Sequence, residues 1–385
     1  MVSKTVVNLL LALALCGFVF TAGCGGGSSK PAELADQPVQ EQVESPQESQ
    51  TPQQDISEAD TQQQVTQPVT QPQPDQTAQA EQVEPADGVE IAMKFKPEDA
   101  ATYKLTTQSE TSVLWEGPDG TKPANFKGGR TGTDVEYTFD QQVQSVNEQG
   151  NATVQVTMKK LKYTARVKDS IVLEFDSTKS ADENSPLAAL IGQSYTIEVA
   201  PSGQVSRVVN AAEARAAVKG GSAAAKAART LLSDDVVKER HAVPALPPGR
   251  NERFQEGGSW SVDKSFNFGM MGAKAYQRVY KLEDIKKSKG GSVAVAEMNA
   301  VPSVEQDKEA QAAQMTNIFT KMFDNTESYT GRLELNLDTG HVLEYTEDLK
   351  TEWLAVDPAY KADEQKRPNA LRMAALRVVH LKKID

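Results

Sequence analysis

From residue 89 onward, apolar residues alternate with polar ones in short runs, which is the two-residue period of a strand with one buried face. Residues 135–139 (VEYTF) form one run and residues 154–158 (VQVTM) form the next, with turn-forming residues 147–151 between them. This pattern predicts an antiparallel hairpin. The same reasoning predicts three further hairpins and a final strand, namely residues 195–199 with 205–209, 276–285 with 293–301, 333–337 with 342–345, and the strand 371–384.

The hairpins fall into two halves with the same internal order. The turn glycines Gly150 and Gly203 of the first half correspond to Gly290 and Gly340 of the second, and the triplet Ser-Tyr-Thr at residues 194–196 recurs at 328–330. In each half an acidic loop and an apolar, helix-like stretch (186–191 and 315–323) separate the two hairpins. A duplicated β-unit explains this order, either as two packed lobes or as one continuous curved sheet. Chance placement of common turn glycines is the alternative.

An alanine-rich segment, residues 210–249, connects the halves. Asn210 and Glu213 have the spacing of a capping box, Gly220 and Gly221 should break the helix, and Ser222 and Ser233 can begin two further helices. The predicted fold is therefore mainly β (α+β). Long antiparallel hairpins in two pseudo-repeated halves form a curved sheet or half-barrel, with the Ala-rich helical segment between the halves.

The chain begins with a targeting segment. Lys4 precedes an apolar run at residues 6–20, which is short for a membrane span, and small residues at 21–23 precede Cys24. The run Thr21-Ala22-Gly23-Cys24 resembles a bacterial lipobox. This resemblance implies that residues 1–23 are a signal peptide and that acyl chains on Cys24 anchor the mature protein, since two or more chains bind a membrane stably. An ordinary signal peptide cut elsewhere is the alternative.

The net charge of −12 is concentrated in one segment. Residues 30–88 hold twelve Asp or Glu, one Lys and no aromatic residue, and they follow a Gly/Ser stretch at 25–29. We expect residues 24–88 to be a lipid-anchored disordered tether, Gly/Ser-rich and then Gln/Pro/Glu-rich. The predicted β-rich domain, residues 89–385, is nearly neutral, with halves at about 89–209 and 250–385 and a connector at 210–249. It lacks the concentrated positive footprint of a nucleic-acid binder.

Motifs for chemistry are weak. No cysteine follows Cys24, so the mature domain has no disulfide, Cys-ligated zinc or thiol nucleophile. His241, His341 and His380 lack a second His or Cys at metal-ligand spacing, and each is expected to be a surface or half-buried structural residue. We therefore predict no catalytic residue, no metal site and no cofactor; lipidation of Cys24 is the one predicted modification.

Three further local patterns suggest chemistry but have a simpler structural explanation. Ser261-Val262-Asp263-Lys264 matches the Ser-x-x-Lys pattern of penicillin-interacting enzymes, but its context is strand-like and no Lys-Thr-Gly follows. The acids at 174, 176, 182 and 183 are expected to form a solvated loop rather than a calcium site, because their spacing matches no known calcium loop. Trp260 is expected to anchor the core.

A second resemblance covers most of residues 90–385. It rests on the run 185–196 (SPLAALIGQSYT) with 201–205 (PSGQV), and on Leu246-Pro247-Pro248 followed by Gly257-Gly258-Ser259-Trp260. These motifs resemble an uncharacterised family of bacterial lipoproteins common in planctomycete-type bacteria. The resemblance implies a lipidated envelope protein and no established activity.

The sequence thus favours a non-catalytic cell-envelope lipoprotein that displays a β-rich binding or structural domain on a tether. The alternative is a carrier or sensor of a hydrophobic ligand, a lipid or lipoprotein, in a half-barrel cavity with residues 187–191 and 318–323 as lids. An envelope hydrolase is the third hypothesis. The expected partners are the membrane, through Cys24, and either an envelope protein or a hydrophobic ligand, with the domain in the periplasm or at the cell surface. Whether the inner or the outer membrane holds the anchor is left open.

Overall fold

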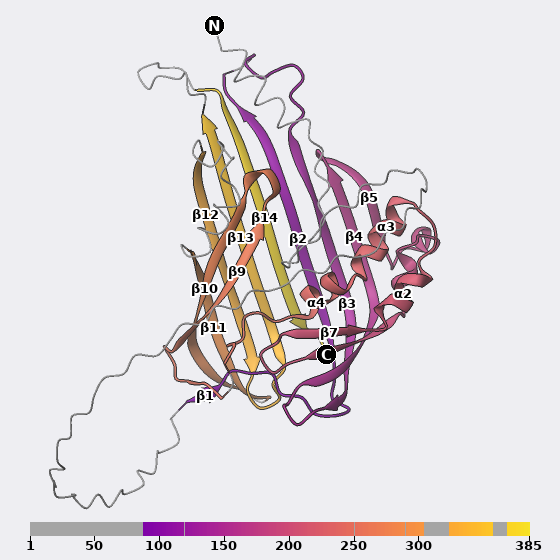
Figure 1. Cartoon of the computed structure of the whole chain (residues 1–385), viewed down its shortest axis with the longest axis vertical. Coiled ribbons are helices and arrows are strands. Elements are labelled where there is room, and N and C mark those ends of the chain that lie inside the picture. Colours follow the sequence, from indigo (N-terminus) through magenta and orange to yellow (C-terminus); the bar gives the residue numbers. More distant parts are fainter. Residues whose placement is uncertain (1–87, 119, 250, 289, 304–322, 357–367) are drawn as a thin grey trace, which may run out of the picture. The chain divides into compact units, whose positions relative to one another are not determined.

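The computed structural model describes residues 88–118, 120–249, 251–288, 290–303, 323–356 and 368–385. The fold is mainly β, with one large antiparallel sheet that is not closed into a barrel and a short helical segment in the middle of the chain (Figure 1). The long strands are β2 (Ala100–Glu116), β3 (Gly129–Val146), β4 (Ala152–Val167), β10 (Ala273–Ser288), β11 (Gly291–Pro302), β12 (Phe323–Asn336), β13 (Val342–Val356) and β14 (Ala370–Lys383). The shorter elements are β1 (Val89–Glu90), β5 (Ser170–Asp176), β6 (Ser194–Val199), β7 (Val205–Val209), β8 (Arg253–Phe254), β9 (Ser259–Asn267), the helices α2 (Ala211–Ala217), α3 (Ala223–Leu231) and α4 (Asp234–His241), and the 3₁₀ turns η1 (Ser180–Asp182), η2 (Ala188–Leu190) and η3 (Gly269–Met271).

Strands that follow each other in the chain are mostly neighbours in the sheet. The order is β7-β6-β4-β3-β2-β14-β13-β12-β11-β10-β9, and β5 also pairs with β4. Each half is therefore an antiparallel meander, and the halves meet where β2 pairs with β14, from Ala370 opposite Glu116 to Lys383 opposite Tyr103. This pairing makes one continuous sheet rather than two lobes.

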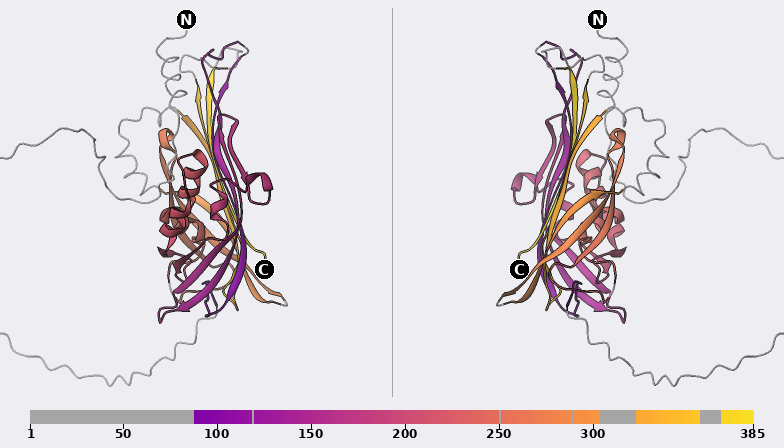
Figure 2. Two further views of the ribbon diagram at one scale, coloured as in Figure 1. Left: turned by 90° about the vertical axis from the view of Figure 1, so that its right-hand side faces the viewer. Right: turned by 90° about the vertical axis from the view of Figure 1, so that its left-hand side faces the viewer.

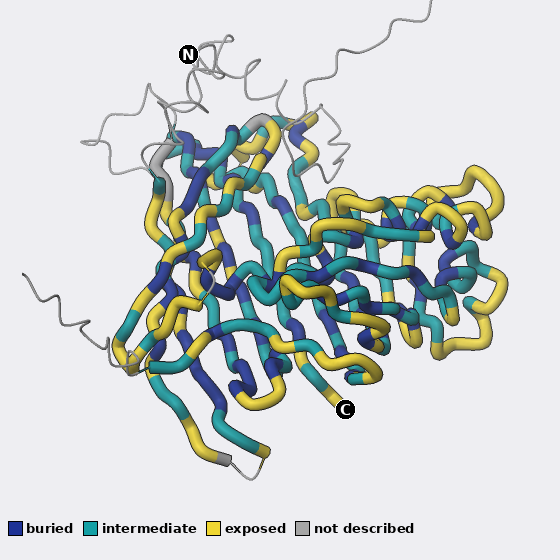
Figure 3. Tube along the Cα trace, turned by 60° about the horizontal axis from the view of Figure 1, so that its bottom comes forward, coloured by how far each residue is buried: buried dark blue, intermediate teal, exposed yellow. Residues whose placement is uncertain are grey.

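Helices α2 to α4 connect β7 at one edge of the sheet to β9 at the other. The connecting segment therefore crosses one face of the sheet, and Figure 2 shows the helices and the curled strands β9 and β10 on the same side. We call this side the inner face. Buried residues follow the strands, whereas exposed residues gather at turns and on the outer side of the helical segment (Figure 3).

The predicted hairpins are confirmed as β3/β4, β6/β7, β10/β11 and β12/β13, and the final strand as β14. The β3/β4 turn shows why the prediction works. The side-chain oxygen of Asn147 accepts the backbone N–H groups of Gln149 and Asn151, both at 3.0 Å, and Gly150 supplies a φ of +76°. Asn and Gly are the residues that close such turns at low cost.

Two local predictions were wrong. The expected acidic loop begins as a strand, because Glu174 and Asp176 lie in β5 opposite Thr164 and Lys162 of β4. The capping box is not formed: Asn210 has a left-handed φ of +65° and its side chain makes no cap bond, so only its carbonyl accepts the N–H of Glu213, at 3.1 Å. Ser222 does cap α3 through its hydroxyl, which accepts the N–H of Ala225 at 3.2 Å.

The first apolar stretch, 186–191, forms the single 3₁₀ turn η2, with Leu187 and Leu190 fully buried. Most of the second stretch, 315–323, lies outside the described residues, and its last residue, Phe323, begins β12. The lid proposed at 318–323 therefore falls almost wholly outside them too.

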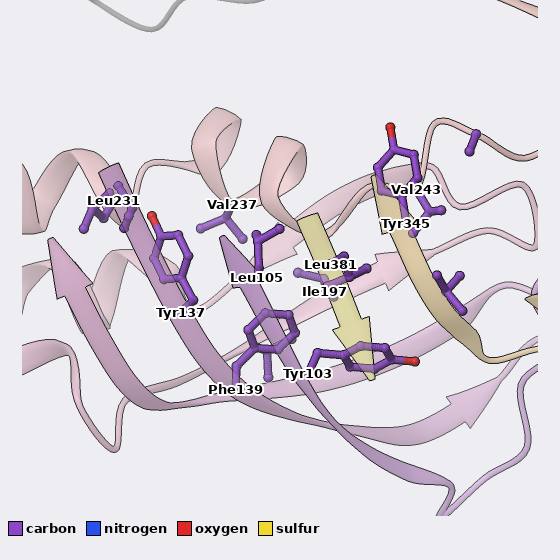
Figure 4. Packing of buried hydrophobic residues seen from close by; sticks show 14 of the residues in the cluster. Tyr103, Leu105, Tyr137, Phe139, Ile197, Leu231, Val237, Val243, Tyr345 and Leu381 are labelled. Atoms are coloured by element: carbon purple, nitrogen blue, oxygen red, sulfur yellow. The ribbon is translucent and has the colours of Figure 1, made fainter. Parts of the chain in front are cut away.

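Small residues let the helices lie close to the sheet. Ala225 and Ala228 of α3 are fully buried, as is Val237 of α4. Figure 4 shows Val237 facing Leu105 and Tyr137 of the inner face.

Within the described ranges, no helix has the length and apolarity needed to cross a membrane.

Candidate functional site

Two groups of buried polar side chains lie on the inner face. The first, the Arg278 cluster, centres on Arg278 of β10 and Glu347 of β13, which form an ion pair through Nη1 and Oε1 with side chains only 1% and 9% exposed. The Tyr329 hydroxyl donates to the other carboxylate oxygen at 3.0 Å, and the Tyr280 hydroxyl lies 3.4 Å from Oε1. Glu347 therefore accepts bonds from a cation and two phenols.

The Arg278–Glu347 pair requires a strongly curled sheet. Strands β11 and β12 lie between β10 and β13, so a flat sheet would separate these two strands by about 14 Å at roughly 4.8 Å per spacing. Gly331 of β12 lies opposite Glu347 in the strand register. A Cβ there would come within 2.6 Å of the Thr346 carbonyl oxygen and 3.0 Å of the Met298 terminal methyl. This position on β12 therefore has no room for a larger side chain.

A second ion pair extends the cluster toward the β9–β10 turn. Lys274 Nζ lies 2.6 Å from Glu327 Oε2, and the Tyr276 hydroxyl donates to the same oxygen at 2.9 Å. The Lys274 ammonium also lies 5.3 Å from the ring centre of Trp353, which in turn packs edge-on against Phe268 at 5.5 Å. These contacts join β10, β12, β13 and the β9–β10 turn across the inner face.

Burial and the Glu347 charge together set the protonation of the cluster. Burial first, and the carboxylate second, raise the pKa of Tyr280, Tyr329 and Tyr345 above the ordinary value for a phenol. Burial opposes the charge of Arg278, but Glu347 beside it raises the arginine pKa overall. The three phenols therefore keep their protons at physiological pH.

The second group, the Arg240 cluster, lies where α4 covers β3 and β6. His241 Nε2 is 2.7 Å from the Tyr195 hydroxyl, which also accepts a bond from Arg240 Nη1 at 3.0 Å. The Arg240 guanidinium lies 4.3 Å from the ring centre of Tyr137, and Phe139 packs edge-on against the His241 ring at 4.7 Å. Burial, and then the Arg240 charge, lower the pKa of His241 well below its ordinary value, so its imidazole is neutral.

Two small cavities adjoin this group. One has a volume of about 20 Å³ and is lined by Arg240, His241 and Gln141 with apolar neighbours. The other, of about 30 Å³, is lined by Asp99 and His341 among others. Each is large enough for one or two water molecules.

The structure corrects one histidine prediction. His241 is buried in the core rather than at or near the surface. His341 and His380 are partly exposed, with ring nitrogens 2.8 Å from Asp99 and 2.7 Å from Glu344. Among the residues that the structure describes, no group of three or more His, Cys, Asp or Glu side chains gathers as a metal site would require. Cys24 lies outside the described residues.

The structure also locates the Ser-x-x-Lys pattern and Trp260, which the sequence singled out. Ser261 and Lys264 are three residues apart on β9, so their side chains point to opposite faces and cannot act together. Trp260 is confirmed as a core anchor: its indole N–H donates to the Ala245 carbonyl at 2.9 Å, and its ring stacks on Tyr280 at 5.7 Å.

Sequence reasoning missed the Arg278 cluster, although a signal was present. Arg278 has the same strand parity as Tyr276 and Tyr280, and Glu347 has the parity of Tyr345 and Leu349, so both charges stood at positions that the apolar pattern assigns to the buried face. A charge at such a position usually has a partner.

Known proteins resemble the chain over part of its length or at low sequence identity. No curated protein matches the chain. Among solved structures, DynF from the dynemicin biosynthesis pathway of Micromonospora chersina is 7% identical, with 81% of this chain and 92% of that chain covered and a TM-score of 0.17. Pseudomonas aeruginosa OccK2 (OpdF), solved in complex with glucuronate, is also 7% identical, with 78% and 99% covered and a TM-score of 0.16. Residues 149–239, which run from the β3/β4 turn into α4, match the model of a family of unknown function (DUF6263), so this part of the chain is similar to an uncharacterised domain.

Proposed function

We propose that the chain is a lipid-anchored protein of the bacterial envelope and that its β-domain is a non-catalytic binding or structural module. The observation that carries this proposal is the mutual pairing of charged groups on the inner face. Arg278 bonds to Glu347 and Lys274 bonds to Glu327, and a tyrosine hydroxyl donates a hydrogen bond to each carboxylate. These groups hold the curled sheet together rather than facing an open site.

The cavity sizes support the same proposal. Small-molecule sites have volumes of about 300–1,000 Å³, whereas the cavities beside the Arg240 cluster measure about 20 and 30 Å³. A polar group acts on a substrate only if a reacting atom can sit within bonding reach of it. On this proposal, the protein's own side chains fill the inner face around both clusters.

Exposed apolar side chains at the β4/β5 turn support a binding role. Val167, Ile171 and Val172 surround the β4/β5 turn with 46%, 55% and 56% of their surface exposed. Neighbouring apolar side chains that stay exposed are a feature of interaction surfaces. Recovery of a defined turnover activity from the purified chain would contradict the non-catalytic part of the proposal.

The anchor is tested by mass and partition. Export of the full chain in a bacterial host should yield a mature protein that begins at Cys24, carries the added mass of two or three acyl chains and enters the detergent phase. Cys24→Ser, which removes the acylated sulfur, should abolish the added mass. A mature, exported wild-type chain without acyl groups would refute the anchor.

The second candidate function is a carrier or sensor of a hydrophobic ligand. The feature that favours it is the open, curled sheet with helices across one face, because this arrangement could surround an apolar molecule if the cover moved. The two functions differ in what occupies the inner face, so a co-purified lipid distinguishes them.

A further inference from the structure

The two buried arginines of the inner face differ in their counter-charge. Arg278 is paired with Glu347, whereas Arg240, 7% exposed, forms no ion pair with any carboxylate of the described residues. The groups around Arg240 are the hydroxyls of Tyr195 and Tyr137, at 3.0 and 3.5 Å, and the Leu231 carbonyl. Its Nε–H has no acceptor in the described part of the chain.

None of these neighbours supplies a negative charge. Burial raises the pKa of Tyr137 and Tyr195, so both phenols keep their protons although Arg240 favours their ionisation. Burial and the Arg240 charge keep His241 neutral. A guanidinium does not give up its proton in a protein. The Arg240 cluster therefore carries one buried positive charge, a costly arrangement unless an anion compensates it.

A space for an anion lies beside this charge. Arg240, His241 and Gln141 line the cavity of about 20 Å³, and the Gln141 amide nitrogen lies 3.4 Å from His241 Nδ1. The remaining walls are largely apolar, including Met93 and Phe139. One water needs roughly 10–15 Å³, so a cavity of about 20 Å³ suits a monatomic occupant better than a carboxylate-bearing metabolite or a phosphate.

We propose that this cavity binds one monatomic anion of the chloride class as the counter-ion of Arg240. The guanidinium supplies the charge, and the side-chain amide of Gln141 adds a neutral donor. Because Arg240 belongs to α4 and Gln141 to β3, the bound anion fastens the helical cover to the sheet. Removal of halide should then loosen the contact between α4 and the inner face.

A halide titration tests the proposal on the mature chain. Its thermal unfolding is measured at constant ionic strength while sodium chloride or bromide replaces sodium gluconate, whose anion is too large for the cavity. Halide should raise the unfolding midpoint, and at 100 times its dissociation constant the apparent unfolding constant should fall about 100-fold. Arg240→Gln should remove this response. Arg207→Gln, which alters an exposed arginine paired with Glu198, should retain it.

Crystals soaked in sodium bromide locate the ion directly. An anomalous peak in contact with Arg240 is the expected result. If Arg240→Gln does not fold, the titration of the unaltered chain and the bromide peak still decide the matter. A midpoint that is the same in halide and gluconate, or a cavity that contains only water in bromide, would overturn the proposal.

Discussion

Replacing Glu347 by Gln tests whether the Arg278–Glu347 pair holds the curled sheet. The substitution keeps the size of the side chain and an oxygen for Tyr329, but it removes the charge that pairs with Arg278, whose side chain is 1% exposed. Removing one partner of a buried pair typically costs about 3–5 kcal/mol, because the remaining charge stays buried without compensation. We expect a loss of this size in the free energy of unfolding.

The assay is urea unfolding of the mature chain followed by tryptophan fluorescence. Trp260 and Trp353 both lie on the inner face near the cluster, so they report on its environment. The thermal midpoint provides a second measure. It should fall by roughly 10 °C, at about 2–4 °C per kcal/mol for a large domain.

Two variants make the result specific. Glu297→Gln removes a carboxylate from an exposed pair with Arg332, 3.2 Å apart, and should cost less than about 1 kcal/mol. The double substitution Arg278→Met with Glu347→Leu removes both buried charges and should recover most of the stability lost in Glu347→Gln. Equal losses for Glu347→Gln and Glu297→Gln, or a double variant less stable than Glu347→Gln, would refute the reasoning.

Four further predictions concern residues of the inner face and how each affects the free energy of unfolding. Folding lowers the pKa of His241, so the neutral imidazole contributes its full stabilisation above pH 6.5. As the pH falls below 6.5, the free energy of unfolding should decrease by up to about 1.4 kcal/mol per pH unit. His241→Gln should flatten this pH dependence in urea unfolding measured between pH 7 and 5. Folding raises the pKa of Tyr329 and its buried neighbours, so the free energy of unfolding should decrease as the pH rises above 10. The absorbance increase at 295 nm that reports ionisation of these phenols should therefore coincide with unfolding. Gly331→Ala should destabilise by about 1–3 kcal/mol in urea unfolding, since the new Cβ meets a backbone oxygen at 2.6 Å; a neutral effect would contradict the close approach. Trp260→Phe should cost about 1–3 kcal/mol in the same assay by leaving the Ala245 carbonyl without its donor; an unchanged denaturation midpoint would count against the anchor.

Hairpins were predictable because their information is local. The alternating apolar positions and the turn residues lie within about twenty residues of each other, as Asn147 and Gly150 show between β3 and β4. Strand β2 was missed because its central residues 106–112 (TTQSETS) are polar on both faces and give no alternation. β2 pairs with β3 on one side and, on the other, with β14, more than 250 residues away, and a contact of that range leaves no local pattern.

The buried sites were predictable only in part. Trp260 was assigned to the core because a large aromatic side chain is usually buried there, and the structure agrees. Arg278 and Glu347 stood at inward-facing strand positions, but nothing in the sequence says that β10 and β13 approach each other. That approach depends on curl across four strands, and a curl of that kind leaves no local pattern. His241 was expected at or near the surface, because no local pattern shows that α4 covers β3.

Native mass spectrometry tests the central claim, that the inner face is filled by the protein's own side chains. The chain from residue 25 onward, without the anchor, is produced in lipid-containing cells and purified without detergent. The account predicts the mass of the polypeptide alone, or with one atom-sized ion. A stoichiometric adduct of several hundred daltons that leaves on delipidation would contradict the filled interior and favour the carrier.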